Sequence, residues 1–448
     1  MKPLNRDEFA AALKKGLGRA WLQVANYGLD DVADLVLEAC LHNQQFDPLC
    51  ESTRAPWLFE MFDNTSHYSR FCDVILSELH TENCTWYMNQ VCRLAKEMAA
   101  HGDEAARQAL RDYTFYRASQ SDEDDWRGTD AWIELTGAEG VIELSRIYGQ
   151  RLLVEPSDNP HQHLFWLDIW EDEIVQSYQA DLLQLVPSDP AIKAYYAYLE
   201  AAGTFTPRQP VNRETAAQQR RQRAREEYPL DRILADARNG VGKYLTHYST
   251  FGHYATPEEL ETVYNALLTV TNNLTRVRLL WVFHQRPLPR LADMFFDWAM
   301  SGDEDLCKAT LSTLKQVSDD RVHALARSKV MSGHLYGADS YALALFLNNY
   351  HAEDAALINV ALVTAKLETD EDAHNLGSSL VILAGQHDDP KLTPALHWVY
   401  ENTPCAFCRH SAVDLLDQFH SLDDALLQEC LHDAEEDTRE LAQKQLGL

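Results

Sequence analysis

Cysteine and histidine residues gather near the end of the chain in a pattern that could bind a metal ion or form a redox-active thiol pair. Cys405 and Cys408 are separated by two residues, His410 follows, and Cys430 and His432 lie one predicted helix further on. A Cys-x-x-Cys pair inside a helix presents both sulfur atoms on one side, which suits dithiol chemistry or zinc binding. However, the predicted apolar stripe includes Cys408, and the side chains of Cys430 and His432 diverge on a helix. The sequence therefore predicts no metal site here, and a redox or metal role for Cys405 and Cys408 stays open.

A second set of reactive side chains lies in residues 41–57, between two predicted helices. This connection crowds together His42, Asp47, Glu51, Arg54 and Trp57. One interpretation is a rim that contacts a ligand or partner, and these residues are therefore candidates for partner binding. The other is a connection between repeats whose polar groups satisfy nearby helix ends. Cys40, His42 and Cys50 do not match a structural zinc pattern, because they lack a close ligand pair and a fourth ligand.

Two further motifs match cofactor sites only in part. The acidic run between Ser121 and Trp126 lacks the regular ligand ladder and the turn glycine of a calcium loop. The segment 240–244, Gly-Val-Gly-Lys-Tyr, is too short for a phosphate-binding loop and follows no predicted strand. We therefore expect no cofactor.

Tryptophan and aspartate occur together in a predicted helix at residues 163–178. Trp166 and Trp170 lie one helical turn apart, and Asp168 falls on another face. This combination resembles that of HEAT-like DNA glycosylases, which place tryptophans and an aspartate in a strongly basic cleft. The present chain has a formal net charge of −30, and no residue set combines a nucleophile, a base and an orienting group. We therefore expect a protein that is not an enzyme.

The acidic composition also restricts the partners of the chain. A net charge of −30 repels phosphate backbones, so general DNA or RNA binding is disfavoured. The charge suits a well-solvated surface or a basic protein partner. No apolar run is long enough to cross a bilayer, the first residues lack a signal peptide's apolar segment, and the 9 cysteines form no disulfide framework. We expect a cytoplasmic protein without membrane association.

The elements that must position these residues are helices, and they are clearest near the end of the chain. Apolar residues follow the i, i+3, i+4, i+7 spacing of a buried stripe at residues 392–399, and a second stripe covers residues 405–419. Two shorter helices are predicted at residues 425–431 and 438–446. Neither helix pair is long enough to bury its apolar side alone, so each must stack on a neighbour.

The second helices of these two pairs are alike in sequence. Arg409 and Arg439 each precede a small or aliphatic core position by three residues. Matching positions upstream continue the pattern with steps of 30, 33, 33, 35 and 30 residues, at Arg278, Lys308, Tyr341, His374, Arg409 and Arg439. From about residue 260 onward this pattern resembles HEAT repeats, especially the short bacterial kind of phycobilisome-lyase-like proteins. The resemblance implies an all-α fold, a right-handed α-α superhelix (a HEAT/armadillo-type solenoid) in two arcs, and a binding scaffold with a concave surface.

A basic segment divides the chain near its middle. Residues 204–229 contain prolines and then a Gln/Arg-rich predicted helix, with a net charge of +3. Its candidates for partner binding are Arg220, Arg221, Arg223 and Arg225. The helix either packs in cis or serves as an arm for an acidic partner or a nucleic acid strand. We predict a divergent helical-repeat arc at residues 1–203, this linker and helix at 204–229, and a HEAT-like arc at 230–448.

These patterns favour binding over catalysis. The first expectation is a non-catalytic scaffold or adaptor that holds a protein partner, with acidic side chains that favour a basic one. One alternative is an acidic inhibitor or immunity-type protein that covers a basic nuclease or mimics nucleic acid, for which salt-sensitive binding would be evidence. Another is an enzyme of the glycosylase type, which would require a basic groove.

Overall fold

The fold is entirely helical in the part of the chain that the structure describes. This computed structural model describes residues 2–79, 88–121, 126–160, 172–205, 213–241 and 245–448. Every regular element in these ranges is a helix, which confirms the expected all-α class. None of the helices described is both long enough and apolar enough to cross a membrane.

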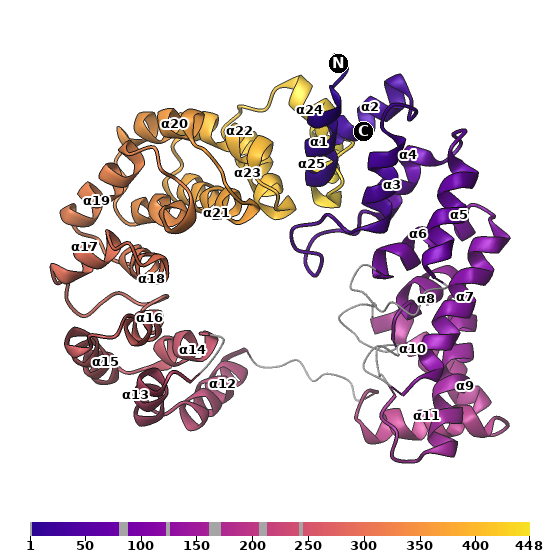
Figure 1. Cartoon of the computed structure of the whole chain (residues 1–448). Helices are drawn as coiled ribbons and strands as arrows, with labels where there is room; N and C mark the ends of the chain where they lie inside the picture. Colours follow the sequence, from indigo (N-terminus) through magenta and orange to yellow (C-terminus); the bar gives the residue numbers. More distant parts are fainter. Residues whose placement is uncertain (1, 80–87, 122–125, 161–171, 206–212, 242–244) are drawn as a thin grey trace. The chain divides into compact units, whose positions relative to one another are not determined.

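The chain divides into two compact units (Figure 1). The first unit consists of residues 1–209 and 428–443, and the second consists of residues 210–427 and 444–448. The boundary at residue 209 lies inside the basic segment 204–229, where the sequence predicts a linker and a helix. Residues 428–443 belong with the N-terminal helices, an association that no sequence pattern predicts.

Helices of the first unit pack in succession along the chain. They are α1 (Arg6–Lys15), α2 (Gly18–Tyr27), α3 (Ala33–Leu41), α4 (Ala55–Phe62), α5 (Tyr68–Glu78), α6 (Met88–Ala100), α7 (Glu104–Ser119), α8 (Thr129–Thr136), α9 (Ala138–Val154), α10 (Asp172–Leu185) and α11 (Pro190–Ala201). Each helix of the series α4, α6, α7, α9 and α11 contacts the next. Completely buried apolar side chains fill these contacts, among them Phe62, Leu94, Leu110, Leu144 and Ile192.

Residues 428–443 complete the first unit. They include the last residues of α24 (Asp424–Cys430) and most of α25 (Glu436–Leu446). The backbone N–H of Ala434 donates to the carbonyl oxygen of Gly16 at 2.8 Å. A Cβ atom on Gly18 would lie 1.9 Å from the carbonyl oxygen of Glu429, so only glycine permits this close approach.

Helices of the second unit form two alternating series. They are α12 (Arg213–Glu227), α13 (Leu230–Asn239), α14 (Thr246–Tyr254), α15 (Pro257–Thr269), α16 (Asn273–Trp281), α17 (Met294–Ala299), α18 (Glu304–Leu314), α19 (Asp320–Met331), the 3₁₀ helix η2 (Gly337–Phe346), α20 (Asp354–Thr364), α21 (Asp370–His387), the 3₁₀ helix η3 (Pro390–Leu392), α22 (Thr393–Asn402) and α23 (Ala406–Gln418). In one series α14, α16, α18, η2, α21 and α23 contact one another in turn, and in the other α19, α20 and α22 do so. Pairs such as α15 with α16 and α22 with α23 join the two series.

Capping side chains begin several of these helices. Thr256 and Glu259 form a capping box, with Pro257 at the first helical position. The Asp303 carboxylate accepts the backbone N–H of Leu306 at 3.1 Å and so begins α18. These caps satisfy backbone donors that would otherwise lack partners at the helix starts.

Arg409 and Arg439, the last two positions of the sequence repeat, make the same local contacts. The Arg409 guanidinium donates to the carbonyl oxygen of Pro404 at 2.9 Å. Arg439 donates to the carbonyl oxygens of Asp433 and Ala434 at 2.7 and 2.9 Å. Each arginine therefore holds the turn that precedes its own helix.

Candidate functional sites

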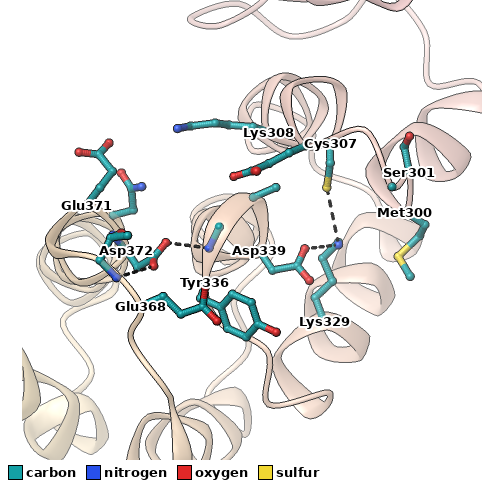
Figure 2. A pocket seen from close by; sticks show the side chains of 16 residues that line it. Met300, Ser301, Cys307, Lys308, Lys329, Tyr336, Asp339, Glu368, Glu371 and Asp372 are labelled. Carbon is teal, nitrogen blue, oxygen red and sulfur yellow. Dashed lines mark hydrogen bonds and ion pairs between the residues drawn. The ribbon is translucent and has the colours of Figure 1, made fainter.

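A hollow lies where α18, η2 and α21 begin, in the second unit (Figure 2). Its volume is about 530 Å³. Charged side chains at or near these three helix starts and at the end of α19 line it. They are the carboxylates of Glu304, Asp339, Glu368, Glu371 and Asp372 and the ammonium groups of Lys308 and, from α19, Lys329. The lining therefore carries an excess of negative charge.

Both lysines already have partners within the unit. Lys329 is buried, forms an ion pair with Asp339, and lies 4.0 Å from the sulfur of Cys307 (Figure 2). Burial raises the pKa of the Cys307 thiol, which favours its neutral form. The Lys308 ammonium lies 5.0 Å from the ring centroid of Tyr341. The remaining carboxylates therefore set the charge that a ligand would meet.

Those carboxylates differ in their freedom to meet a ligand. Asp372 is buried and accepts the backbone N–H of Gly337 at 2.7 Å and that of Thr369 at 3.1 Å. It therefore joins the start of α21 to the start of η2. Glu368 and Glu371 are exposed at the rim of the hollow, so a ligand can reach them.

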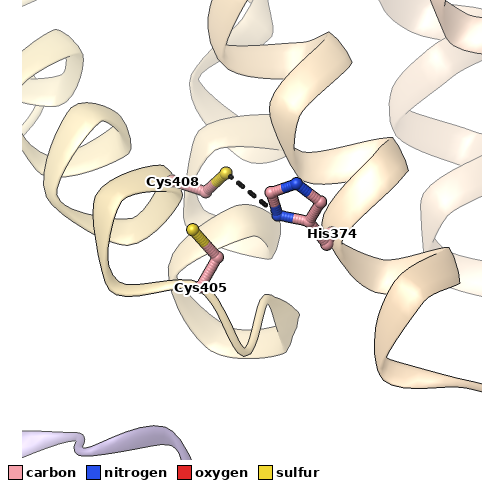
Figure 3. Close-up of side chains that lie close together, drawn as sticks. All are labelled: His374, Cys405 and Cys408. Carbon is pink, nitrogen blue, oxygen red and sulfur yellow. Dashed lines mark hydrogen bonds between the residues drawn. The ribbon is translucent and has the colours of Figure 1, made fainter. Parts of the chain in front are cut away.

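A second cluster joins α21 to the start of α23 (Figure 3). The ligand atoms of His374, Cys405 and Cys408 all lie within 4.8 Å of one another. The Cys408 sulfur is 3.7 Å from Nδ1 of His374. Cys405 is the residue just before α23, and both cysteines are buried.

This environment favours a thiolate. Hydrogen bonds from Cys408, His374 and the Cys408 backbone N–H hold the pKa of the Cys405 thiol well below its ordinary value, although burial opposes them. By contrast, burial raises the pKa of the thiols of Cys40, Cys72 and Cys92. Cys405 is therefore chemically unlike the other buried cysteines compared with it.

The structure brings Cys405 and Cys408 together but not Cys430 and His432, the other pair of the Cys/His motif. Cys430 and His432 belong to the first unit, where the imidazole of His432 stacks on Trp21 with ring centroids 4.3 Å apart. The third member beside Cys405 and Cys408 is His374, 34 residues before Cys408. In the sequence, His374 is marked only as a repeat position, and no local pattern identifies it as a possible ligand.

Another cluster of possible ligands is occupied by hydrogen bonds. His323, His351 and Asp354 lie close together. The Asp354 carboxylate pairs with His323 at 2.8 Å and with Arg327, and it accepts the backbone N–H of His351 at 2.9 Å. A metal ion would have to displace the Arg327 guanidinium, so this arrangement is a structural ion pair rather than a metal site.

In the segment 41–57, whose last three residues belong to α4, three of the five candidate side chains make internal contacts. The buried Arg54 guanidinium donates to the carbonyl oxygens of Lys14 and Lys15, at 2.6 and 3.3 Å, and lies 3.4 Å from Glu51. It thereby caps the end of α1. The Trp57 indole N–H donates to the carbonyl oxygen of His432 at 2.8 Å.

The other candidates of this connection are more accessible. His42 is exposed and lies 3.4 Å from Glu38, and Asp47 is half-buried. Cys40 is buried whereas Cys50 is exposed. The partner-binding role of His42, Asp47, Glu51, Arg54 and Trp57 stays a prediction.

The arginine-rich helix α12 packs against α14 and exposes its guanidinium groups. Ala224 is buried, and Arg225 donates to the carbonyl oxygen of Tyr254 at 3.3 Å. Arg220, Arg221 and Arg223 are exposed. One side of the helix therefore packs in cis, and the other carries positive charge to solvent.

Several predicted features lie outside the described residues. They are Trp166, Asp168 and Trp170, residues 122–125 of the acidic loop, and residues 242–244 of the glycine-containing segment. The glycosylase-like combination therefore has no structural test.

Comparisons with known proteins give no family for this chain. No protein-family model matches it, and neither a curated protein nor a solved structure does.

Proposed function

We propose that the chain is a non-catalytic scaffold that holds a basic segment of a protein partner. The proposal includes a HEAT-like, right-handed superhelix of helix pairs. Two observations support it: the alternating helix contacts of the second unit, and the matching contacts of Arg409 and Arg439. Stacked pairs of this kind bring helix ends together along one edge, where a partner can lie.

The hollow at the starts of α18, η2 and α21 carries the proposal. Its volume of about 530 Å³ is in the range of ligand-binding pockets. A lysine or arginine of the partner would place its cationic group between Glu368 and Glu371. The stem of that side chain would pack on Met300, which lines the hollow and is 63% exposed.

The charge of the whole chain acts in the same direction over a longer distance. A net charge of −30 accelerates association with a cationic partner. Salt screens this attraction, with a Debye length of about 10 Å at 0.1 M ionic strength. Binding should therefore weaken as the salt concentration rises.

A labelled oligolysine peptide tests this proposal by fluorescence anisotropy. The double substitution Glu368→Gln and Glu371→Gln should weaken binding roughly 10-fold, because two exposed charge pairs are lost. The matched control is Glu104→Gln with Glu139→Gln, which changes the net charge equally and alters exposed residues in the first turns of α7 and α9. The control should stay within about 2-fold of the unmodified chain.

Two results would contradict the proposal. One is an equal loss of affinity in both double variants, because net charge alone would then explain binding. The other is the absence of oligolysine binding at low salt.

A further inference from the structure

The cluster of His374, Cys405 and Cys408 has the composition of a metal centre. Two thiols and one imidazole are ligands that Zn²⁺ prefers. They come from neighbouring helices, because His374 lies in α21 and the cysteines flank the start of α23. A metal ion here would cross-link two successive helices of the second unit.

The distances also fit a tetrahedral site. With Zn–S bonds of about 2.3 Å and Zn–N bonds of about 2.0–2.1 Å, a sulfur and a nitrogen ligand lie about 3.6 Å apart. The separation of Cys408 Sγ and His374 Nδ1 is 3.7 Å. The largest separation within the cluster, 4.8 Å at most, closes to a tetrahedral edge with a side-chain movement of about 1 Å.

We propose that His374, Cys405 and Cys408 bind one Zn²⁺ ion. Water or an incoming group fills the fourth coordination position, since these three residues are the ligands that the cluster supplies. Two thiolates neutralise the charge of the ion, which reduces the cost of placing it among buried residues. The N-terminal end of α23 further stabilises the thiolates.

Burial favours a metal centre over a dithiol that exchanges with other proteins. The attacking sulfur of an exchanging pair must be accessible, whereas Cys405 and Cys408 are 5% and 7% exposed. A reversible Cys405–Cys408 disulfide is nevertheless a distinct outcome that the experiment can detect.

Metal analysis of the full-length chain tests the proposal. The chain is purified under reducing conditions from cells supplied with zinc, dialysed against metal-free buffer, and analysed by plasma mass spectrometry. We expect about one zinc ion per chain, and a loss of zinc affinity of more than about 100-fold in Cys405→Ser, Cys408→Ser and His374→Gln. Cys50→Ser and His323→Gln are matched controls that should retain the zinc, because neither residue belongs to the cluster.

A second measurement uses only the unmodified chain, so it does not depend on whether a variant folds. Metal is removed from the unmodified chain with a chelator, and Co²⁺ is added while the absorption spectrum is recorded. We expect a thiolate-to-cobalt charge-transfer band that saturates at one equivalent and disappears when Zn²⁺ displaces the cobalt. Absence of this band, zinc retention in all three cluster variants, or a Cys405–Cys408 disulfide that forms in glutathione buffer despite added zinc would overturn the proposal.

Discussion

The connection at residues 41–57 in the first unit and the hollow of the second unit use similar side chains in opposite ways. In the connection, Glu51 and Arg54 are buried beside each other, and Arg54 caps the end of α1. Around the hollow, Glu368 and Glu371 are exposed. A cluster of charged residues in a long connection can therefore form buried ion pairs and helix caps as readily as a binding surface.

The largest effect should come from Arg54→Met. This substitution deprives the buried Glu51 of its cationic neighbour and the end of α1 of two donors. We expect a loss of about 3–5 kcal/mol in the free energy of unfolding, the usual result of breaking a buried pair from one side. Urea unfolding followed by circular dichroism measures it.

The control for Arg54 is an ion pair on the surface of the second unit. Arg321 and Asp293 are 3.1 Å apart, and their side chains are 50% and 96% exposed. Arg321→Met should change the free energy of unfolding by less than about 1 kcal/mol. If both variants lose the same free energy of unfolding, the ion pair of Arg54 contributes no more than an exposed one, and the claim of a structural role for the connection is wrong.

A smaller effect is expected from Gly18→Ala. The new Cβ would meet the carbonyl oxygen of Glu429 at 1.9 Å, so α2 and the end of the chain must separate. We expect a loss of about 2–3 kcal/mol, together with faster proteolysis of residues 428–443. Gly302, which borders the hollow and has nothing within 4 Å of its Cβ position, supplies the control Gly302→Ala. An unchanged rate of proteolysis in Gly18→Ala would refute the close packing.

The smallest effect concerns pH. Burial, with a lesser contribution from Lys315, lowers the pKa of His284 to about 4. The unfolded chain protonates near the ordinary value of about 6.5, so the contribution of His284 to stability is complete above pH 6.5 and is lost as the pH falls toward 4. His284→Gln should therefore reduce the proton uptake on unfolding near pH 5 by up to about one proton.

The first unit supplies the comparison for this histidine. Burial also lowers the pKa of His432, so His432→Gln should reduce the pH dependence in the same direction and to a smaller extent. Unfolding curves at several pH values measure both variants. A pH dependence that His284→Gln leaves unchanged would contradict the assignment.

Local features of the fold were predictable because they depend on neighbours in sequence. The helix predicted at residues 405–419 follows from apolar spacing, and the structure has α23 at Ala406–Gln418. Around the repeat position Tyr341, however, the structure has the 3₁₀ helix η2, and the backbone N–H of its first residue donates to the Asp372 carboxylate. That contact spans 35 residues and has no local signature.

The candidate sites were less predictable because they combine distant residues. In the repeat register, His374 lies one repeat before Arg409, which is next to Cys408 in the sequence. Successive repeats pack together, so the register indicates that His374 lies near Cys408. The residue types alone do not. The contact of Gly18 with Glu429 had no comparable signal. A single glycine near the start of a helix does not indicate which distant segment approaches it.

Hydrogen–deuterium exchange with and without oligolysine tests the central claim most directly, because it shows which of the two regions a basic ligand contacts. If the hollow binds the basic ligand, exchange slows at residues 300–308, 336–341 and 368–375 and stays unchanged at residues 41–57. Slower exchange confined to residues 41–57, with none around the hollow, would contradict this claim.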